Sequence, residues 1–140
     1  MIANKIFVLG GYDGQKALTT NTAYYPSRDL AGEDPWETLA PLPEGRYAMG
    51  VTHLANVIYL AGGITDQGTL ARITIQYIPP SNEWAEYDAP PIPAGAHGVL
   101  LSSGGFLHYL GGESTQGLLA THEAYQAIYT YSIPILRDDK

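Results

Sequence analysis

Short apolar runs recur along the chain, and each of them ends in a pair of glycines. The runs KIFVL, VIYLA and FLHYL come directly before the doublets Gly10-Gly11, Gly62-Gly63 and Gly111-Gly112. A short apolar run that is bounded by turn residues is typical of a buried β-strand. The residue spacing of an amphipathic helix is not seen in the sequence. The hydrophobic pattern therefore predicts an all-β fold.

The glycine doublets mark a sequence repeat. Their first glycines are 52 and 49 residues apart (62 − 10 and 111 − 62). A period of about fifty residues indicates one structural unit that is repeated about three times along the chain. Further positions coincide when the units are aligned: Gln15, Gln67 and Gln116; Leu18, Leu70 and Leu119; Tyr24, Tyr77 and Tyr125; Gly50 and Gly98. Each unit offers about four candidate strands, and the first two units add a tryptophan, Trp36 and Trp84, before a proline-rich exit.

This pattern resembles the kelch repeat, in which four antiparallel strands form one blade of a β-propeller. The resemblance rests on the glycine doublet, the spaced tyrosine and the tryptophan, and it covers nearly the whole chain. It implies a single kelch-like domain, 1–140, with blades at about residues 1–43, 44–93 and 94–140. We expect the recurring tyrosines and tryptophans to pack between blades. The first unit departs from the repeat by the insertion SRDLAGED, and the third unit has no tryptophan.

Three blades make an incomplete ring, because closed propellers have about four to eight. Only the residues MIAN precede the first apolar run, so the first blade is expected to have three strands. Three blades of sixfold geometry would enclose about half a ring and expose apolar faces and strand edges at both ends. We therefore expect a homodimer that completes a six-bladed ring, with the third blade of each chain on the first blade of the other.

The segment from Ala127 to Leu136 is a candidate for strand exchange between the two chains. It is rich in β-branched and aromatic residues, which favour strands. Two alternatives remain open: it completes the first blade of the partner, or it forms the outer strand of the third blade. A fragment of a longer propeller and a larger closed ring are further alternatives to the homodimer.

A binding face is expected where loops within the blades meet the connections between blades, because propeller loops carry function on a rigid frame. The candidate ligand-face residues are Tyr12, Asp13, Gln15, Arg46, Tyr47, Asp66, Gln67, His97, Glu113 and Gln116. Arg46 is similar to the arginine that often lines the channel mouth of kelch propellers. An alternative role for the three matching glutamines is to bond loop backbone in a recurring turn.

The resemblance implies a non-catalytic interaction module that presents these loops to a protein, a peptide or a glycan. One alternative is a self-assembling half-propeller without a dedicated ligand. Another is a sugar enzyme similar to sialic-acid mutarotases, for which Glu44, His97 and Glu113 are the candidate acid–base groups. No pair among the three has a diagnostic spacing, so no catalytic residue is assigned. A galactose-oxidase-like enzyme is excluded, because its crosslinked tyrosine needs a cysteine and the chain has none.

Composition narrows the possible partners. The net charge is −7, from 14 acidic and 7 basic residues, so nucleic acid and anionic membranes are poor partners. The absence of cysteine excludes a disulfide or zinc–thiolate site, and the four histidines lack metal-ligand spacing. Neither a metal nor a cofactor is expected. No signal peptide or membrane-spanning run of about 20 apolar residues is recognisable, which makes a cytoplasmic location the default expectation.

Overall fold

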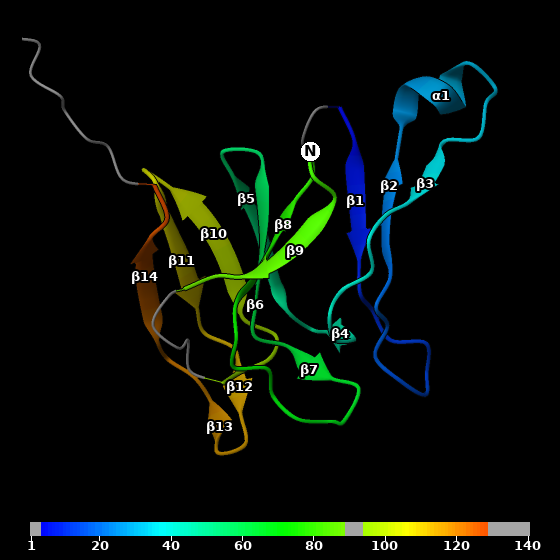
Figure 1. The fold of residues 1–140 in the computed structure, drawn as a ribbon. Coiled ribbons are helices and arrows are strands. Elements are labelled where there is room, and N and C mark those ends of the chain that lie inside the picture. Colours follow the sequence, from blue (N-terminus) through cyan, green and yellow to red (C-terminus); the bar gives the residue numbers. More distant parts are fainter. Residues whose placement is uncertain (1–3, 89–93, 129–140) are drawn as a thin grey trace, which may run out of the picture.

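The computed structural model describes residues 4–88 and 94–128, and strands account for nearly all of the regular structure in them. The all-β prediction is therefore confirmed. Three antiparallel sheets follow one another along the chain (Figure 1): β1 (Ile6–Leu9), β2 (Asn21–Tyr24) and β3 (Trp36–Thr38); then β5 (Gly50–Leu54), β6 (Val57–Ala61), β8 (Ile75–Ile78) and β9 (Glu83–Glu86); then β10 (Val99–Ser103), β11 (Phe106–Leu110) and β14 (His122–Gln126).

Two short ladders lie together at one end of the sheets (Figure 1). In the first, β4 (Arg46–Tyr47) pairs with β7 (Ile64–Thr65), and in the second, β12 (Glu113–Ser114) pairs with β13 (Gly117–Leu118). A single helical turn, α1 (Pro26–Leu30), lies at the opposite end (Figure 1). No helix of the described residues is long and apolar enough to cross a bilayer.

The second sheet lies between the other two and is buried on both faces. Its residues Ile58 and Leu60 are 4% and 0% exposed and pack with Phe7 and Leu9 of the first sheet. On the opposite face, Tyr59 packs in a separate apolar cluster with the third sheet. Because side chains alternate between the two faces of a strand, the continuous run VIYLA supplies both clusters. This explains why the central strand reads as uninterrupted hydrophobic sequence.

A polar link joins the first two sheets beside the first cluster. The indole nitrogen of Trp84 donates a hydrogen bond to the carbonyl oxygen of Ala40 at 2.8 Å. The side-chain oxygen of Asn82 accepts bonds from the Ala40 amide and from the Tyr77 hydroxyl, at 2.8 and 2.7 Å. The chain that leaves the first sheet is thus held against the outer strands of the second.

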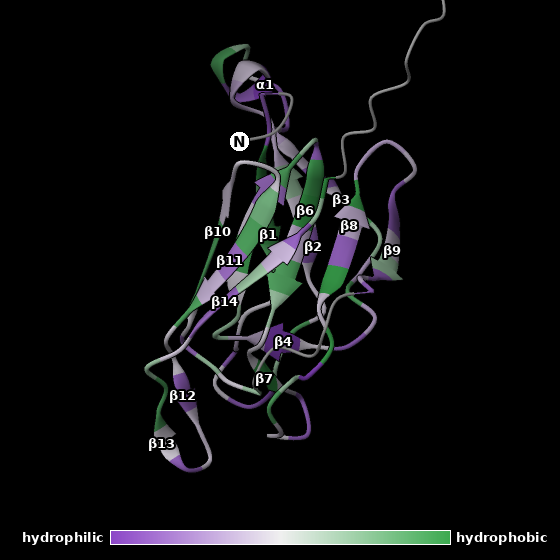
Figure 2. Cartoon of the chain, turned by 90° about the vertical axis from the view of Figure 1, so that its left-hand side faces the viewer, coloured by the Kyte–Doolittle hydropathy of each residue, from purple (hydrophilic) through white to green (hydrophobic). Residues whose placement is uncertain are grey.

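The outer faces of the first and third sheets are open to solvent. We call the outer face of the first sheet the first flank; it consists of Ile6, Val8, Thr22, Tyr24, Trp36 and Thr38. We call the outer face of the third sheet the third flank; it consists of Val99, Leu101, Ser103, Phe106, His108, Leu110, His122, Ala124 and Gln126. Figure 2 views the molecule from the side of the third sheet. Residues that face each other across a ladder share a face, which defines both sets.

Three expectations need correction. A short helix that the hydrophobic pattern did not show, α1, begins at Pro26 just before the insertion and continues into it, and Pro26 provides a favourable φ angle in its first turn. Gly50 and Gly98 are not equivalent. Gly50 pairs with Ala61, the residue before the second glycine doublet, whereas it is Val99, the residue after Gly98, that pairs with Leu110, the residue before the third doublet. Trp36 is 51% exposed on the first flank, and Tyr24 lies on the same flank. Within one chain, the expected packing between sheets therefore holds for Tyr77, Trp84 and Tyr125 but not for Tyr24 or Trp36.

The segment proposed for strand exchange, Ala127 to Leu136, lies outside the described residues from residue 129 onward. The described part of β1 pairs with β2 along one edge, and no described strand pairs with its other edge. In the second sheet, β5 occupies the corresponding edge of β6.

Candidate binding face

The candidate residues come from loops and short ladders at the end of the sheets opposite α1 (Figure 1). The loop after β1 carries Tyr12, Asp13 and Gln15; the β4–β7 ladder and its loop carry Arg46, Tyr47, Asp66 and Gln67; the connection before β10 and the β12–β13 hairpin carry His97, Glu113 and Gln116. Eight of the ten are exposed, whereas Tyr47 is half-buried and Arg46 is buried. The rigid sheets thus present most of the set to solvent.

The matching glutamines lie in a turn that is built in the same way three times. The amide of each glutamine donates to the side-chain oxygen of the residue two positions earlier: Gln15 to Asp13, Gln67 to Thr65 and Gln116 to Ser114. Short polar side chains that bond to nearby amides stabilise such turns. The turn therefore depends on the residue two positions before the glutamine, a signal that the sequence alignment missed. The glutamine side chains extend into solvent on an exposed loop.

Asp13 shows the electrostatic consequence of this turn. Its carboxylate oxygen accepts bonds from the amides of Gln15 and Lys16, at 2.9 and 2.8 Å. These two backbone bonds, the one from Lys16 first, lower the pKa of Asp13 from its usual value. Asp13 thus remains ionised on the loop surface over a wider pH range than a free carboxyl group.

Two pairs of candidate side chains meet at this end of the molecule. The rings of Tyr12 and Tyr47 lie with centroids 4.8 Å apart. The Nε2 atom of His97 lies 3.4 Å from a carboxylate oxygen of Glu113, and both side chains are more than half exposed. The amide of His97 also donates to the carbonyl of Ala48, the residue after Tyr47. The two pairs are therefore linked through one backbone hydrogen bond.

His97 has an unusual backbone conformation. Its φ angle is +59°, in the left-handed region, and Ala48 has a φ angle of +53°. Both residues stand at the same place relative to the strand that follows, β10 and β5 respectively, as the strand pairing shows. Because the conformation recurs where the chain enters a sheet, it is a feature of the connection between sheets. It also fixes the direction in which the His97 side chain leaves the backbone.

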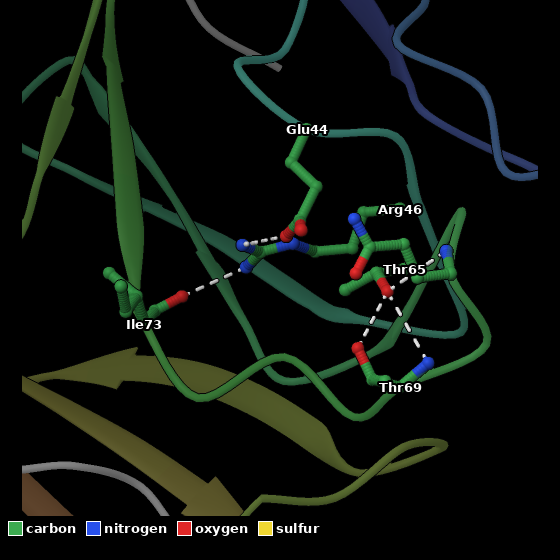
Figure 3. Close-up of polar contacts among 6 residues, drawn as sticks. Glu44, Arg46, Thr65, Thr69 and Ile73 are labelled. Atoms are coloured by element: carbon green, nitrogen blue, oxygen red, sulfur yellow. Dashed lines mark hydrogen bonds and ion pairs between the residues drawn. The ribbon is translucent and has the colours of Figure 1, made fainter.

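Arg46 is held inside the molecule (Figure 3). It is 3% exposed, and its guanidinium donates to the carbonyl of Ile73 at 2.9 Å and lies 3.5 Å from Glu44. Burial lowers the pKa of Arg46, and the neighbouring Glu44 opposes this effect. Its Nε atom is buried without a hydrogen-bond partner among the described residues. The Arg46 guanidinium is therefore buried between Glu44 and the carbonyl of Ile73, and its side chain does not lie on the exposed loop face.

The four histidines show a contact that their spacing in the sequence did not reveal. The Nδ1 atom of His108 lies 3.0 Å from the Nε2 atom of His122 on the third flank. No cluster of three or more candidate metal ligands occurs among residues 4–88 and 94–128. The pair joins residues that are distant in sequence, so only the pairing of β11 with β14 brings them together.

Comparisons with known proteins bear on the family. No protein-family model matches the chain. Among curated proteins, Kelch-like protein 40 of Xenopus laevis is 30% identical over 112 residues, which is 80% of this chain and 17% of that protein. Kelch-like protein 40b of Danio rerio is 31% identical over 79% of this chain and 18% of its own length. Kelch-like protein 15 of Homo sapiens is 28% identical over 76% of this chain and 18% of its own length.

The chain belongs to the kelch-repeat family. It spans less than a fifth of the length of these curated relatives. Kelch homology suggests that the three sheets are propeller blades. Kelch-repeat domains are generally protein-binding modules.

Proposed function

We propose that this kelch domain is a non-catalytic recognition module whose loop face binds a protein or peptide, or a glycan. One observation supports this most directly: eight of the ten candidate side chains are exposed together at one end of the three sheets. Exposed aromatic and polar groups on loops that a rigid frame positions are suited to recognition. The Tyr12–Tyr47 and His97–Glu113 pairs supply apolar area and charge to the face.

The loop face is tested by panning a random-peptide phage library on the protein. We expect enriched peptides to lose at least about tenfold in affinity for the double variant Tyr12→Ala/Glu113→Ala, because both side chains lie on the proposed surface. Glu33→Ala is the matched control, since Glu33 is exposed near α1 at the opposite end. Peptides that bind the double variant as tightly as the wild type would contradict a peptide site at the loop face.

A glycan array probed with the same variants tests the second ligand class, a glycan.

We further propose that two copies close a six-bladed ring through the first and third flanks. Equivalent positions within the chain support this. Ile6 and Val8 of the first flank are 44% and 43% exposed, whereas Ile58 and Leu60 at the same positions of the second sheet are 4% and 0% exposed. The first sheet covers Ile58 and Leu60, and a third sheet from a second copy would cover Ile6 and Val8 in the same way. Apolar flanks of this kind favour association.

Because the first flank of one chain contacts the third flank of the other, the two chains associate head-to-tail. The ring closes with two chains if each chain contributes half of it. Insertion of a charge into one flank should therefore prevent closure. We expect Val8→Asp to reduce the association of the chains, whereas Leu30→Asp should leave it unchanged, because Leu30 is 91% exposed on α1 and outside both flanks. Equal association of wild type and Val8→Asp would exclude the first flank from the interface.

The role of Ala127 to Leu136 remains a proposal with two forms. The open edge of β1 lies beside a groove of about 210 Å³ between β1 and β5, which is a suitable place for an added strand. The spacing in the second sheet supports the other form. β8 ends at residue 78 and β9 begins at residue 83, so an outer strand after β14 would begin at about residue 131. We therefore favour an outer strand of the third sheet over exchange.

A further inference from the structure

The third flank carries two histidines in direct contact. The ring nitrogens Nδ1 of His108 and Nε2 of His122 are 3.0 Å apart, and the ring planes are 23° from parallel. A hydrogen bond between two imidazoles needs one N–H group and one bare nitrogen. The contact therefore exists only while at least one of the two rings is neutral.

Both histidines occupy positions that are buried in the other sheets. By strand pairing, His108 corresponds to Tyr59 and His122 corresponds to Thr74, which are 5% and 7% exposed. In the first sheet, the same positions are Phe7, which packs edge-on against Tyr77, and Asn21, which is 2% exposed. In each case the next sheet follows on that side. A sheet from a second copy on the third flank would therefore cover the histidine pair.

The surroundings of the pair provide little compensation for added positive charge. On its own flank the neighbours are Val99, Leu101, Phe106, Leu110, Ala124 and Gln126, none of which is charged. Glu123 follows His122 but alternates to the opposite face of β14. The first flank of a second copy would bring Ile6, Val8, Thr22, Tyr24, Trp36 and Thr38, which are also uncharged.

The charged groups beside the first flank are already engaged. Asp29 accepts a hydrogen bond from the Tyr24 hydroxyl at 2.5 Å. Lys5 and Arg28 lie over the ring of Tyr25. Glu37 alternates with Trp36 to the other face of β3 and accepts a bond from Tyr25. Asp34 accepts a hydrogen bond from the amide of Trp36 at 3.0 Å. Asp29 and Asp34 are thus carboxylates adjacent to the flank, and each already accepts a hydrogen bond from a flank residue.

We propose that the His108–His122 pair makes closure of the ring sensitive to pH, an inference that rests on the proposed assembly. With both rings neutral, the pair makes one internal hydrogen bond and no charge is enclosed, so covering it costs less than covering a protonated pair. When both rings are protonated, the acceptor is lost and two like charges would be enclosed by apolar surface. Open chains keep both rings in water. Protonation therefore favours separation, and the ring would contain one such pair at each of its two interfaces.

The experiment compares the dissociation constant of the assembly at about pH 7.5 and about pH 5, the range over which histidine changes charge. We expect the constant of the wild type to rise at least about tenfold at the lower pH, because separated chains bind more protons than the closed ring. The test variant is His108→Phe/His122→Asn, which places the residue types of Phe7 and Asn21 at the equivalent positions. Its assembly should be insensitive to pH over the same range.

Control variants are His53→Asn and His97→Asn, which replace exposed histidines outside the third flank and should keep the wild-type response. Circular dichroism at both pH values verifies that every variant is folded. A wild-type ring of equal strength at both pH values would overturn the switch and leave the assembly intact. Retention of the full response in the double variant would assign it to other groups and overturn the switch. A monomer at about pH 7.5 would overturn the assembly itself, and the switch with it.

Discussion

At the scale of single residues, the two tryptophans of the repeat have different surroundings. Trp84 packs against the cluster between the first two sheets and bonds to Ala40, whereas Trp36 is 51% exposed on the first flank. We predict that Trp84→Ala lowers the free energy of unfolding by about 3 to 5 kcal/mol, and that Trp36→Ala costs clearly less. Urea denaturation of dilute protein measures both. Equal losses would show that Trp36 is not exposed on the first flank of the separated chain.

The glycines of the doublets also differ in what surrounds them. Gly62 has a φ angle of +64°, and a Cβ atom there would overlap the carbonyl oxygen of Gly95 and lie 2.8 Å from the Tyr109 hydroxyl. Gly68 has a similar φ angle of +73°, but a Cβ atom would meet nothing within 4 Å. The two positions therefore separate steric overlap from backbone strain.

We predict that Gly68→Ala lowers the free energy of unfolding by about 1 kcal/mol, the cost of the left-handed conformation for a non-glycine residue. Gly62→Ala should cost substantially more, because the overlap with backbone is added to the same strain. Thermal or urea denaturation of the two variants provides the comparison. A Gly62→Ala variant as stable as Gly68→Ala would mean that the connection between the second and third sheets is looser than described.

At the scale of elements, the recurring loop turn leads to a prediction about pH. The pKa of Asp13 is lowered in the folded protein by hydrogen bonds from the Lys16 and Gln15 amides. A carboxyl group with a lowered pKa stabilises the fold above its unfolded pKa, and this contribution is lost as the pH falls through the folded value. Asp13→Asn should therefore be less stable than the wild type at neutral pH, and the difference should shrink below about pH 4.

The melting temperatures of the two proteins across this pH range test the prediction. Ser27→Ala serves as a control for the loss of an exposed polar side chain away from the turn, since Ser27 is exposed and lies in α1. A difference between wild type and Asp13→Asn that does not change with pH would show that the turn does not depend on the charge of Asp13.

The strands before the glycine doublets were predictable because the same local pattern, an apolar run followed by two glycines, recurs in each repeat. The runs before the glycine doublets form β1, β6 and β11, as expected. The helix α1 was not predictable from periodicity, since a five-residue turn is too short to show any. The mismatch of Gly50 and Gly98 arises because the third repeat carries one more residue between this glycine and the doublet (111 − 98 = 13 against 62 − 50 = 12), and the pairing register confirms the shift.

The candidate site was predictable in position and only partly in detail. Loop residues such as Tyr12 and Glu113 lie at the same end of the sheets because the strand order dictates it. The burial of Arg46 depends on the carbonyl of Ile73, which is 27 residues away, and no local pattern encodes that contact. The histidine pair likewise requires the β11–β14 ladder.

At the scale of the whole molecule, the central feature is the contrast between one covered sheet and two open flanks. The middle sheet shows what an inner position needs, namely apolar residues on both faces. The third flank has the same character but is open, with Val99, Leu101 and Phe106 exposed by 53%, 52% and 38%. Because exposed apolar area of this kind favours association, we expect a second copy of the chain to cover both flanks.

The most direct test is the mass of the wild-type protein by size-exclusion chromatography with light scattering, at about neutral pH and over a range of concentrations. We expect a species with twice the 15.1 kDa mass of the chain, which dissociates on dilution or when Leu101→Asp places a charge in the third flank. A stable particle of 15.1 kDa at every concentration, or a larger closed ring, would contradict the two-chain propeller.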